Sequence, residues 1–260
     1  MLHHEISGNG KKNLILLHGF MENSSIWNDL EKTLSKNFTL IKIDLPGHGQ
    51  SKLYHEINSM DFMAEKVKEV LDFLKIEKIN ILGHSMGGYV SLAFAVKFPE
   101  FIESLTLFFS TTLEDNEEKK QIRRRSIAVI DENFETFVKT SIPNLFSNTE
   151  RDVLEGKIEL AKEIAKSTDK KGVKAAQLGM AERPDRTKIL ENLDAKILII
   201  AGQHDNAVKT DSLIEVIPDK TNIKTYVLDC GHNGHWEKPT ICAEIINTEL
   251  LHNLPKHLVF

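Results

Sequence analysis

"ILGHSMGGYV", residues 81–90, places Ser85 between Gly83 and Gly87, after one apolar run and before another. A serine on a sharp strand-to-helix turn needs small neighbours, because a Cβ at either flanking position would collide with the turn. Such a turn lifts the hydroxyl above the sheet and directs the helix N-terminus at any oxyanion formed there. The stretch predicts a nucleophilic serine, although a glycine-rich turn with a chance serine gives the same letters. A phosphate loop is disfavoured, since no G-x-x-x-x-G-K-[ST] pattern is present.

Short apolar runs alternate with helical patterns along the first half and the end of the chain. The runs have strand length and are rich in β-formers; they are "NLILL" (13–17), "FTLIKID" (38–44), "INILG" (79–83), "LTLFF" (105–109), "KILIIAG" (196–202) and "IKTYVLD" (223–229). Between them, residues 60–76 place an apolar stripe on one helix face, and residues 87–99 have the pattern of a buried helix stopped by Pro99. This alternation predicts an α/β fold with a mostly parallel sheet covered on both faces.

The alternation is interrupted in the middle of the chain. Residues 112–190 contain no convincing strand, and their composition and spacing are helical. We therefore expect an α/β core formed by residues 1–111 and 191–260, with residues 112–190 inserted as an all-helical cap over the sheet. Residues 240–254 are expected to form the closing helix.

Composition excludes several classes of protein. The net charge of −5 argues against a nucleic-acid binder, which needs a basic face. No apolar run approaches the ~20 residues needed to span a bilayer, and "MLHHEISGNG" lacks the order of a signal peptide. Cys230 and Cys242 are the only cysteines, so a disulfide scaffold is not expected and the cytoplasm is the expected compartment.

Motifs at the strand ends resemble those of the α/β-hydrolase family, in the family's order and over essentially the whole chain. They are "LILLHGF", "IDLPGHGQS", "GHSMGG", "ILIIAGQHD" and "GHNGHWEKP". The resemblance implies the α/β-hydrolase fold with Ser85 as nucleophile, and a Ser–Asp–His order in the chain. It implies no cofactor, and no His/Cys/Asp cluster has the spacing of a metal site.

The serine needs a base from another loop. Histidines after the last two strands are His232, His235, His252 and His257. His252 and His257 follow the last helix, far from the strand ends. His232 follows Gly231, as the family motif requires, so we predict His232 as the base. His235 competes for this role and is otherwise expected to line the pocket or face solvent.

An acid must orient the imidazole. Asp205 lies just past the run "ILIIAG", at a strand end. Asp211 is expected to begin a helix, and Asp229 is too close in sequence to reach round to His232. We therefore predict Asp205 as the acid.

Backbone N–H groups are expected to form the oxyanion hole. The residue after the nucleophile is Met86, and the family resemblance implies Phe20, after His-Gly, as the second donor. The ring of His18 is expected to hold that loop, and Glu237 with Pro239 to shape the histidine loop.

The sequence therefore predicts a serine carboxylesterase-type hydrolase acting on a small-molecule ester with a small or medium apolar acyl group. Thioesterases, C–C bond hydrolases, lyases of the menaquinone pathway and cofactor-free perhydrolases share the same triad and stay open, as does a non-catalytic ligand receptor. The basic run Arg123–Arg125 is either a solvated helix face or an anion clamp. Candidate pocket residues are Phe20, Trp27, Phe109, Phe134, Phe137, Phe146, Met180 and Trp236.

Overall fold

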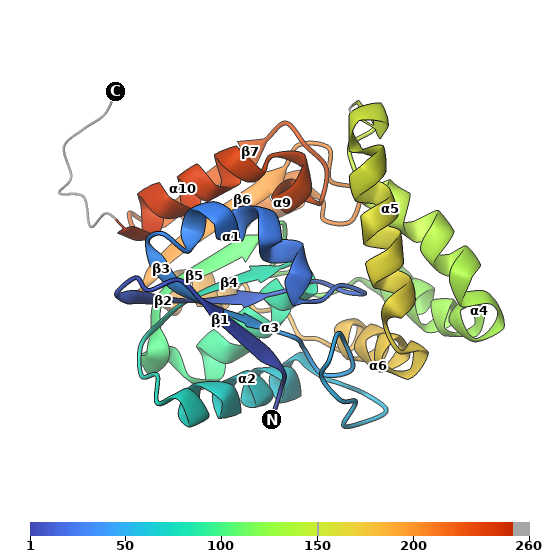
Figure 1. Cartoon of the computed structure of the whole chain (residues 1–260), viewed down its shortest axis with the longest axis horizontal. Coiled ribbons are helices and arrows are strands. Elements are labelled where there is room, and N and C mark those ends of the chain that lie inside the picture. Colours follow the sequence, from blue (N-terminus) through green and yellow to red (C-terminus); the bar gives the residue numbers. More distant parts are fainter. Residues whose placement is uncertain (150, 252–260) are drawn as a thin grey trace.

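A seven-stranded sheet crosses the computed structural model, which describes residues 1–149 and 151–251 (Figure 1). Its strand order is β1-β3-β2-β4-β5-β6-β7, and every neighbouring pair is parallel except β1 with β3. The strands are β1 (His4–Ser7), β2 (Lys12–Leu17), β3 (Phe38–Ile43), β4 (Ile79–His84), β5 (Ile102–Phe108), β6 (Lys196–Gly202) and β7 (Ile223–Leu228). Each predicted run lies in a strand, which confirms the α/β fold class. The edge strand β1 was not predicted, because its sequence HEIS carries a single apolar residue.

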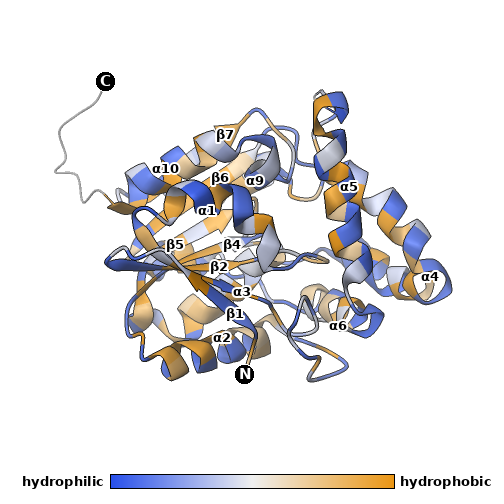
Figure 2. Cartoon of the chain, in the orientation of Figure 1, coloured by the Kyte–Doolittle hydropathy of each residue, from blue (hydrophilic) through white to orange (hydrophobic). Residues whose placement is uncertain are grey.

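Helices cover both faces of the sheet, and this explains why the inner strands are mostly apolar. Helices α1 (Asn28–Leu34) and α10 (Pro239–Leu251) lie on one face, and α2 (Met60–Leu74) and α3 (Met86–Lys97) on the other (Figure 1). In β2, Ile15 and Leu17 face the α2–α3 side whereas Leu14 and Leu16 face the α1–α10 side. Figure 2 shows the resulting hydrophobic strands between helices with one hydrophobic face.

The helices begin and end close to the predicted positions. Ser59 caps α2 by accepting a hydrogen bond from the N–H of Phe62, and α3 covers the predicted buried helix. The closing helix α10 is described to Leu251; the rest of its predicted range lies outside the described residues. The remaining short helices are η1 (Ser24–Trp27), η2 (Pro99–Phe101), α8 (Thr210–Ile214) and α9 (Gly234–Glu237).

Between β5 and β6, the described residues of 112–190 form helices and no strand. The helices are α4 (Glu117–Ser141), η3 (Ile142–Leu145), α5 (Arg151–Ser167), α6 (Lys170–Ala181) and α7 (Lys188–Asn192). Helices α4, α5 and α6 stand together beside one end of the sheet (Figure 1). Helix α4 is kinked at Asn133, whose φ of −153° and ψ of 82° are not helical. Among the described residues, no helix combines the length and apolar character needed to cross a membrane.

The backbone is packed closely where β4 turns into α3. An added Cβ on Gly83 would lie 2.2 Å from the carbonyl oxygen of Gly87, and one on Gly87 would lie 2.3 Å from that of Leu17. These obstacles are backbone atoms, so a side chain at either position forces the turn itself to move. The two positions therefore require glycine because of contact distance, since neither glycine has a positive φ.

We expect Gly83→Ala to lower the free energy of unfolding by about 2 kcal/mol, because an overpacked site without a flexible neighbour must distort its backbone. Urea unfolding followed by circular dichroism measures this change. The control is Gly156→Ala on α5, where an added Cβ meets nothing within 4 Å. It should leave stability unchanged or raise it by up to ~1 kcal/mol through helix propensity. Equal stabilities for the two variants would contradict the close approach.

Candidate active site

Ser85 occupies a strained turn between β4 and α3. Its φ of 50° and ψ of −113° are unusual for a residue with a side chain, and such strain persists only where surrounding contacts hold it. The N–H of Ser85 donates to the carbonyl of Phe108 (3.1 Å), and its own carbonyl accepts from the Ser110 hydroxyl (2.8 Å) and the Gly88 N–H (2.9 Å). These bonds fix the hydroxyl-bearing carbon at the carboxyl end of the sheet.

Two further strained residues border the same region. Met21 follows β2 and Phe109 follows β5, and both have positive φ values, 58° and 49°. Backbone strain of this kind gathers at functional sites. The backbone that follows β2, β4 and β5 is therefore strained in one region around Ser85.

The predicted base and acid are in direct contact. His232 Nδ1 lies 2.7 Å from Asp205 Oδ2, and both side chains are almost fully buried. Asp205 Oδ1 accepts from the N–H groups of Ala207 (2.7 Å) and Val208 (2.8 Å). Burial alone would raise the pKa of Asp205, but the charge of His232 and these hydrogen bonds hold it below its ordinary value. Asp205 is therefore an anion that orients the imidazole through Nδ1 and leaves Nε2 for other chemistry.

The other acids considered lie elsewhere. Asp229 is exposed and pairs with His204 (2.9 Å). Asp211 lies in the first turn of α8, after the N-cap residue Lys209, so its predicted place at the helix start is off by two residues. Of the other histidines considered, His252 and His257 lie outside the described residues.

The histidine loop is held by one buried carboxylate, as predicted for Glu237. Glu237 Oε2 accepts from the N–H groups of Gly231 (2.8 Å) and Ser147 (3.0 Å), and its Oε1 accepts from that of Asn233 (3.0 Å). The N–H of His232 donates to the carbonyl of Leu145 (2.8 Å). The backbone on both sides of His232 is therefore anchored, and part of that anchor comes from residues 145–147.

The backbone N–H groups of Phe20 and Met86 make no hydrogen bond to any residue that the structure describes. His18 shapes the loop before Phe20: its Nε2 accepts from the Leu45 N–H (2.9 Å), so the proton lies on Nδ1, which donates to the Gly19 carbonyl (2.7 Å). Burial lowers the pKa of His18, which agrees with this neutral form. Both amides have the free donor that an oxyanion hole requires.

The site also contains a buried ion pair, between Glu22 and His84, that was not predicted from the sequence. His84 Nδ1 lies 2.8 Å from Glu22 Oε2, and His84 Nε2 lies 3.0 Å from the carbonyl oxygen of His232. Because a carboxylate and a carbonyl only accept, both ring nitrogens carry protons and His84 is an imidazolium. Glu22 Oε2 also accepts from the Gly19 N–H (2.6 Å). The pair thus joins the loop after β2, the serine turn and the histidine loop.

The two pKa values follow from this pairing. Burial opposes both charges, but the His84 charge and hydrogen bond lower the pKa of Glu22 to about 2. The Glu22 charge in turn raises the pKa of His84 above its ordinary 6.5. Both partners are consequently charged between these limits.

His235 does not line a pocket or face solvent, contrary to the sequence-based expectation. It is fully buried against Trp27, His84 and Trp236, and neither ring nitrogen has a hydrogen-bond partner among the described residues. Its Nε2 lies 4.0 Å from Glu22 Oε1. Burial lowers the pKa of His235 well below its ordinary value, so the ring is neutral.

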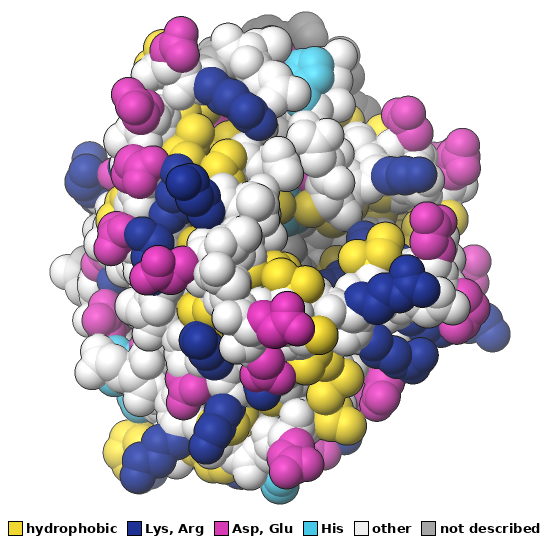
Figure 3. Space-filling model, turned by 90° about the vertical axis from the view of Figure 1, so that its right-hand side faces the viewer, with side chains coloured by type: hydrophobic (Ala, Val, Ile, Leu, Met, Phe, Trp, Pro, Cys, Tyr) yellow, Lys and Arg dark blue, Asp and Glu magenta, His cyan; other side chains and the backbone are white. Residues whose placement is uncertain are grey.

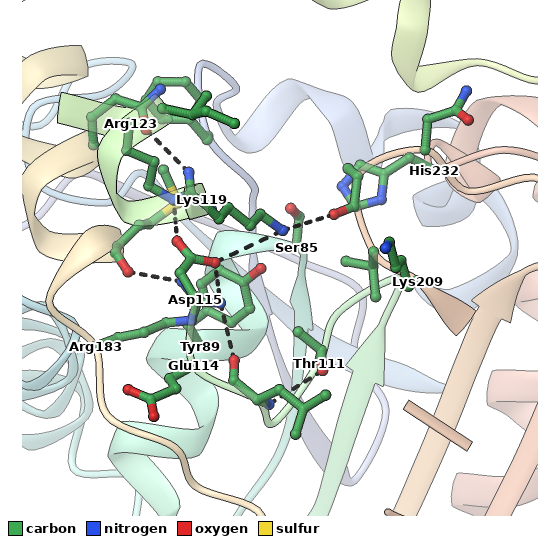
Figure 4. A pocket seen from close by; sticks show the side chains of 18 of the residues that line it. Ser85, Tyr89, Thr111, Glu114, Asp115, Lys119, Arg123, Arg183, Lys209 and His232 are labelled. Carbon is green, nitrogen blue, oxygen red and sulfur yellow. Dashed lines mark hydrogen bonds and ion pairs between the residues drawn. The ribbon is translucent and has the colours of Figure 1, made fainter. Parts of the chain in front are cut away.

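A cavity of about 970 Å³ lies between the carboxyl ends of the strands and helices α4 and α6. Ser85 and His232 both line it, and Figure 4 shows them on one side of it. Figure 3 views this end of the molecule, where apolar side chains gather between charged ones of both signs. Within the described ranges, no group of His, Cys, Asp or Glu is arranged to hold a metal ion.

Only part of the predicted pocket lining faces this cavity. Phe20, Phe137 and Met180 line it. The other aromatic residues pack in the hydrophobic core instead; they are Trp27, Phe109, Phe134, Phe146 and Trp236. Aromatic content alone does not distinguish the two groups, because both occur beside the same strand ends and helices.

The opposite side of the cavity is polar. Of the basic run, Arg123 faces the cavity and pairs with Asp115, whereas Arg124 and Arg125 are exposed. Arg183 also pairs with Asp115, at 2.9 Å. Burial opposes ionisation of Asp115, but the two arginines lower its pKa to about 2.

The sequence profile of the alpha/beta hydrolase fold matches residues 12–239. Among solved structures, a thermophilic esterase from Thermogutta terrifontis, determined with malate bound, has a TM-score of 0.91 and 30% identity, covering 96% of this chain and 93% of its own.

Two curated relatives match over most of their length. A putative 2-succinyl-6-hydroxy-2,4-cyclohexadiene-1-carboxylate synthase of Bacillus subtilis is 27% identical over 92% of this chain and 90% of its own. A 2-hydroxy-6-oxononadienedioate/2-hydroxy-6-oxononatrienedioate hydrolase of Escherichia coli is 26% identical over 91% and 86%. An uncharacterized Mycobacterium tuberculosis protein is 39% identical, but the match spans only 30% of its length.

Glu22→Gln should lower stability by about 3 kcal/mol near pH 5.5, because it leaves a buried imidazolium without its counter-charge. Ionised Glu22 stabilises the fold above its ordinary pKa of 4.5, and this contribution is lost as the pH falls toward about 2. Protonated His84 stabilises the fold below its ordinary pKa of 6.5, and this is lost as the pH rises through its raised pKa. The difference from the unmodified protein should therefore be widest between pH 4.5 and 6.5.

Thermal unfolding across this pH range tests the ion pair. The control is Glu69→Gln, which removes an exposed ion pair with Lys66 and should change stability by less than ~1 kcal/mol. A stability difference for Glu22→Gln that is flat from pH 3 to pH 9 would contradict the charged pair.

Proposed function

The chain belongs to the alpha/beta hydrolase family, and we propose that within it the protein is a serine hydrolase that cleaves carboxylic esters through an acyl-enzyme intermediate. One observation carries the proposal: Ser85 and His232 line the same cavity, while the His232 Nδ1 is bonded to the buried carboxylate of Asp205. The ester class is supported by the 30% identity to the Thermogutta terrifontis esterase.

In the proposed first step, His232 Nε2 removes the proton of the Ser85 hydroxyl, and the oxygen attacks the ester carbonyl. Asp205 keeps the imidazole oriented and stabilises the imidazolium that forms. The N–H groups of Phe20 and Met86 donate to the carbonyl oxygen as it becomes an oxyanion. The proton on Nε2 then passes to the leaving alcohol, and the acyl group stays on Ser85.

The second half reverses these roles with water. His232 takes a proton from water, the hydroxide attacks the acyl carbonyl, and the tetrahedral intermediate expels the Ser85 oxygen, which recovers its proton from His232. The carboxylic acid leaves and the enzyme returns to its first state. Neither half uses a side chain from residues 112–190, so we propose that this segment is a cap that selects substrates.

C–C bond hydrolysis is the second candidate. The Escherichia coli relative is named as a hydrolase of 2-hydroxy-6-oxononadienedioate, and the Bacillus subtilis relative as a putative carboxylate synthase. The same serine and histidine can serve such reactions, thioester hydrolysis or perhydrolysis, and a receptor without catalysis keeps the same fold.

We propose the cytoplasm as the compartment, where the free thiols of Cys230 and Cys242 would stay reduced.

Ser85→Ala should reduce kcat for a short p-nitrophenyl ester on the order of a millionfold, by analogy with other serine triads. The substitution removes only a hydroxyl, so the circular dichroism spectrum should stay that of the unmodified protein. The matched control is Ser212→Ala, a serine of the same cavity lining outside the proposed machinery, which should keep ordinary turnover. If the Ser85 variant retains a tenth of the activity, another residue is the nucleophile.

His232→Gln should be almost inactive, whereas His235→Phe should keep kcat within about tenfold of the unmodified protein. His232 is bonded to the acid and lines the cavity, whereas His235 lies buried among aromatic rings with no hydrogen bond. Steady-state kinetics with one short ester near pH 7 compares the two. An inactive His235 variant beside an active His232 variant would reverse the assignment.

A further inference from the structure

The side of the cavity opposite His232 holds one carboxylate surrounded by cations (Figure 4). Asp115 is 1% exposed and forms ion pairs with Arg123 and with Arg183. Lys119 Nζ lies 3.8 Å from the same carboxylate. One negative charge thus faces three positive charges, and the Lys119 side chain, which is 41% exposed, is open to an anion that enters the cavity.

Both arginines form hydrogen bonds to other groups of the protein. Arg183 donates to the carbonyls of Met180 (2.8 Å) and Leu113 (3.0 Å), and its guanidinium lies 4.0 Å from the centre of the Tyr89 ring. Arg123 donates to Gln177 (3.0 Å) besides Asp115. These contacts hold the cluster in place and leave Lys119 as its least engaged cation.

Lys119 brings its ammonium from helix α4 to the loop of the predicted acid. Its Nζ donates to the carbonyl of Ala207 (3.0 Å), and the Ala207 N–H is bonded to Asp205. Figure 4 shows the side chain extending from the Asp115 cluster toward the side of the cavity that holds Ser85 and His232. An ammonium has three N–H donors, and one strong bond leaves capacity for a ligand.

Tyr89 offers a second hydrogen-bond donor to the same side of the cavity. Its side chain lines the cavity at 3% exposure, yet its hydroxyl makes no hydrogen bond to any residue in the described part of the chain. The hydroxyl is not one of the fully buried side-chain atoms that lack a partner, so it is open to the cavity and can donate to a ligand there. A donor without a partner beside Lys119 and Arg123 suits the oxygen atoms of an anion.

The other four acids of the lining offset part of this charge, although three of them are bonded to partners outside the cluster. Glu114 pairs with Lys120, and Glu22 pairs with His84. Asp185 accepts from the N–H and the hydroxyl of Thr187. Glu118 adds one further acid to the lining and Lys209 one further cation, so the two offset each other.

We propose that this side of the cavity binds the carboxylate of an anionic substrate, so that the preferred ester is the monoester of a dicarboxylic acid. Lys119 and Tyr89 donate to the carboxylate, and the Asp115–Arg123–Arg183 cluster supplies the positive field. The inference rests on the proposed ester hydrolysis and names its substrate class. It assigns Arg123 to the anion site and leaves Arg124 and Arg125 as a solvated helix surface.

Paired ethyl esters test the anion site. Monoethyl and diethyl esters of the dicarboxylic acids from succinate to suberate share the reacting group and differ in charge at the far end, and a pH-stat near pH 7.5 follows both. For the best chain length, kcat/KM should favour the monoester by about tenfold, the value of one good charged hydrogen bond. Lys119→Met should lower this ratio by about tenfold.

Lys162→Met is the control, because Lys162 lies on α5, pairs with Glu159 and does not line the cavity. It should leave the monoester preference unchanged. Hydrolysis of the diesters without any monoester preference, or equal ratios in the two lysine variants, would overturn the anion site and leave the ester assignment standing. Hydrolysis of neither series would overturn the ester assignment itself, and the anion site with it.

Discussion

The site depends on one constraint: the turn at Ser85 leaves no space for a side chain on Gly83 or Gly87. Backbone carbonyls lie 2.2–2.3 Å from where a Cβ would stand on Gly83 or Gly87. This packing forces the φ of 50° at Ser85, and the bonds to Phe108 and Ser110 hold it there. In the proposed mechanism the strain has a chemical use, because it presents the hydroxyl at the start of α3 and leaves the N–H of the next residue free.

A buried ion pair connects this rigid turn to two other loops of the site. Glu22 and His84 join the loop after β2 to the backbone of His232. Such a pair contributes little net stability, since burying two charges costs about as much as their attraction returns. Its value lies in geometry: three loops from distant parts of the chain share one hydrogen-bonded network below the cavity. Removing either charge leaves the other one buried without a counter-charge, so both residues are needed for the network to be stable.

Strand ends and motif residues could be predicted from the sequence because they depend on local patterns. An apolar run covered on both faces, such as the one before Asp205, can be recognised from its own residues. The run before His232 is the partly exposed edge strand β7, which was predicted from its β-forming residues. The lining of the cavity depends on long-range packing instead. Arg183 meets Asp115 across 68 positions, and Trp27 enters the core whereas Phe137 faces the cavity, although both are aromatic. His235 was misplaced for the same reason, since nothing in "GHNGHWEKP" shows which histidine is buried.

The central claim is that Ser85 forms a covalent acyl intermediate, and active-site labelling tests it most directly. The unmodified protein is incubated with a fluorophosphonate, digested and mapped by mass spectrometry. The account predicts one adduct per chain, on Ser85, formed more slowly when His232 is replaced by Gln because the base that activates the hydroxyl is gone. An adduct on any other residue, or no adduct while esters are still hydrolysed, would contradict it.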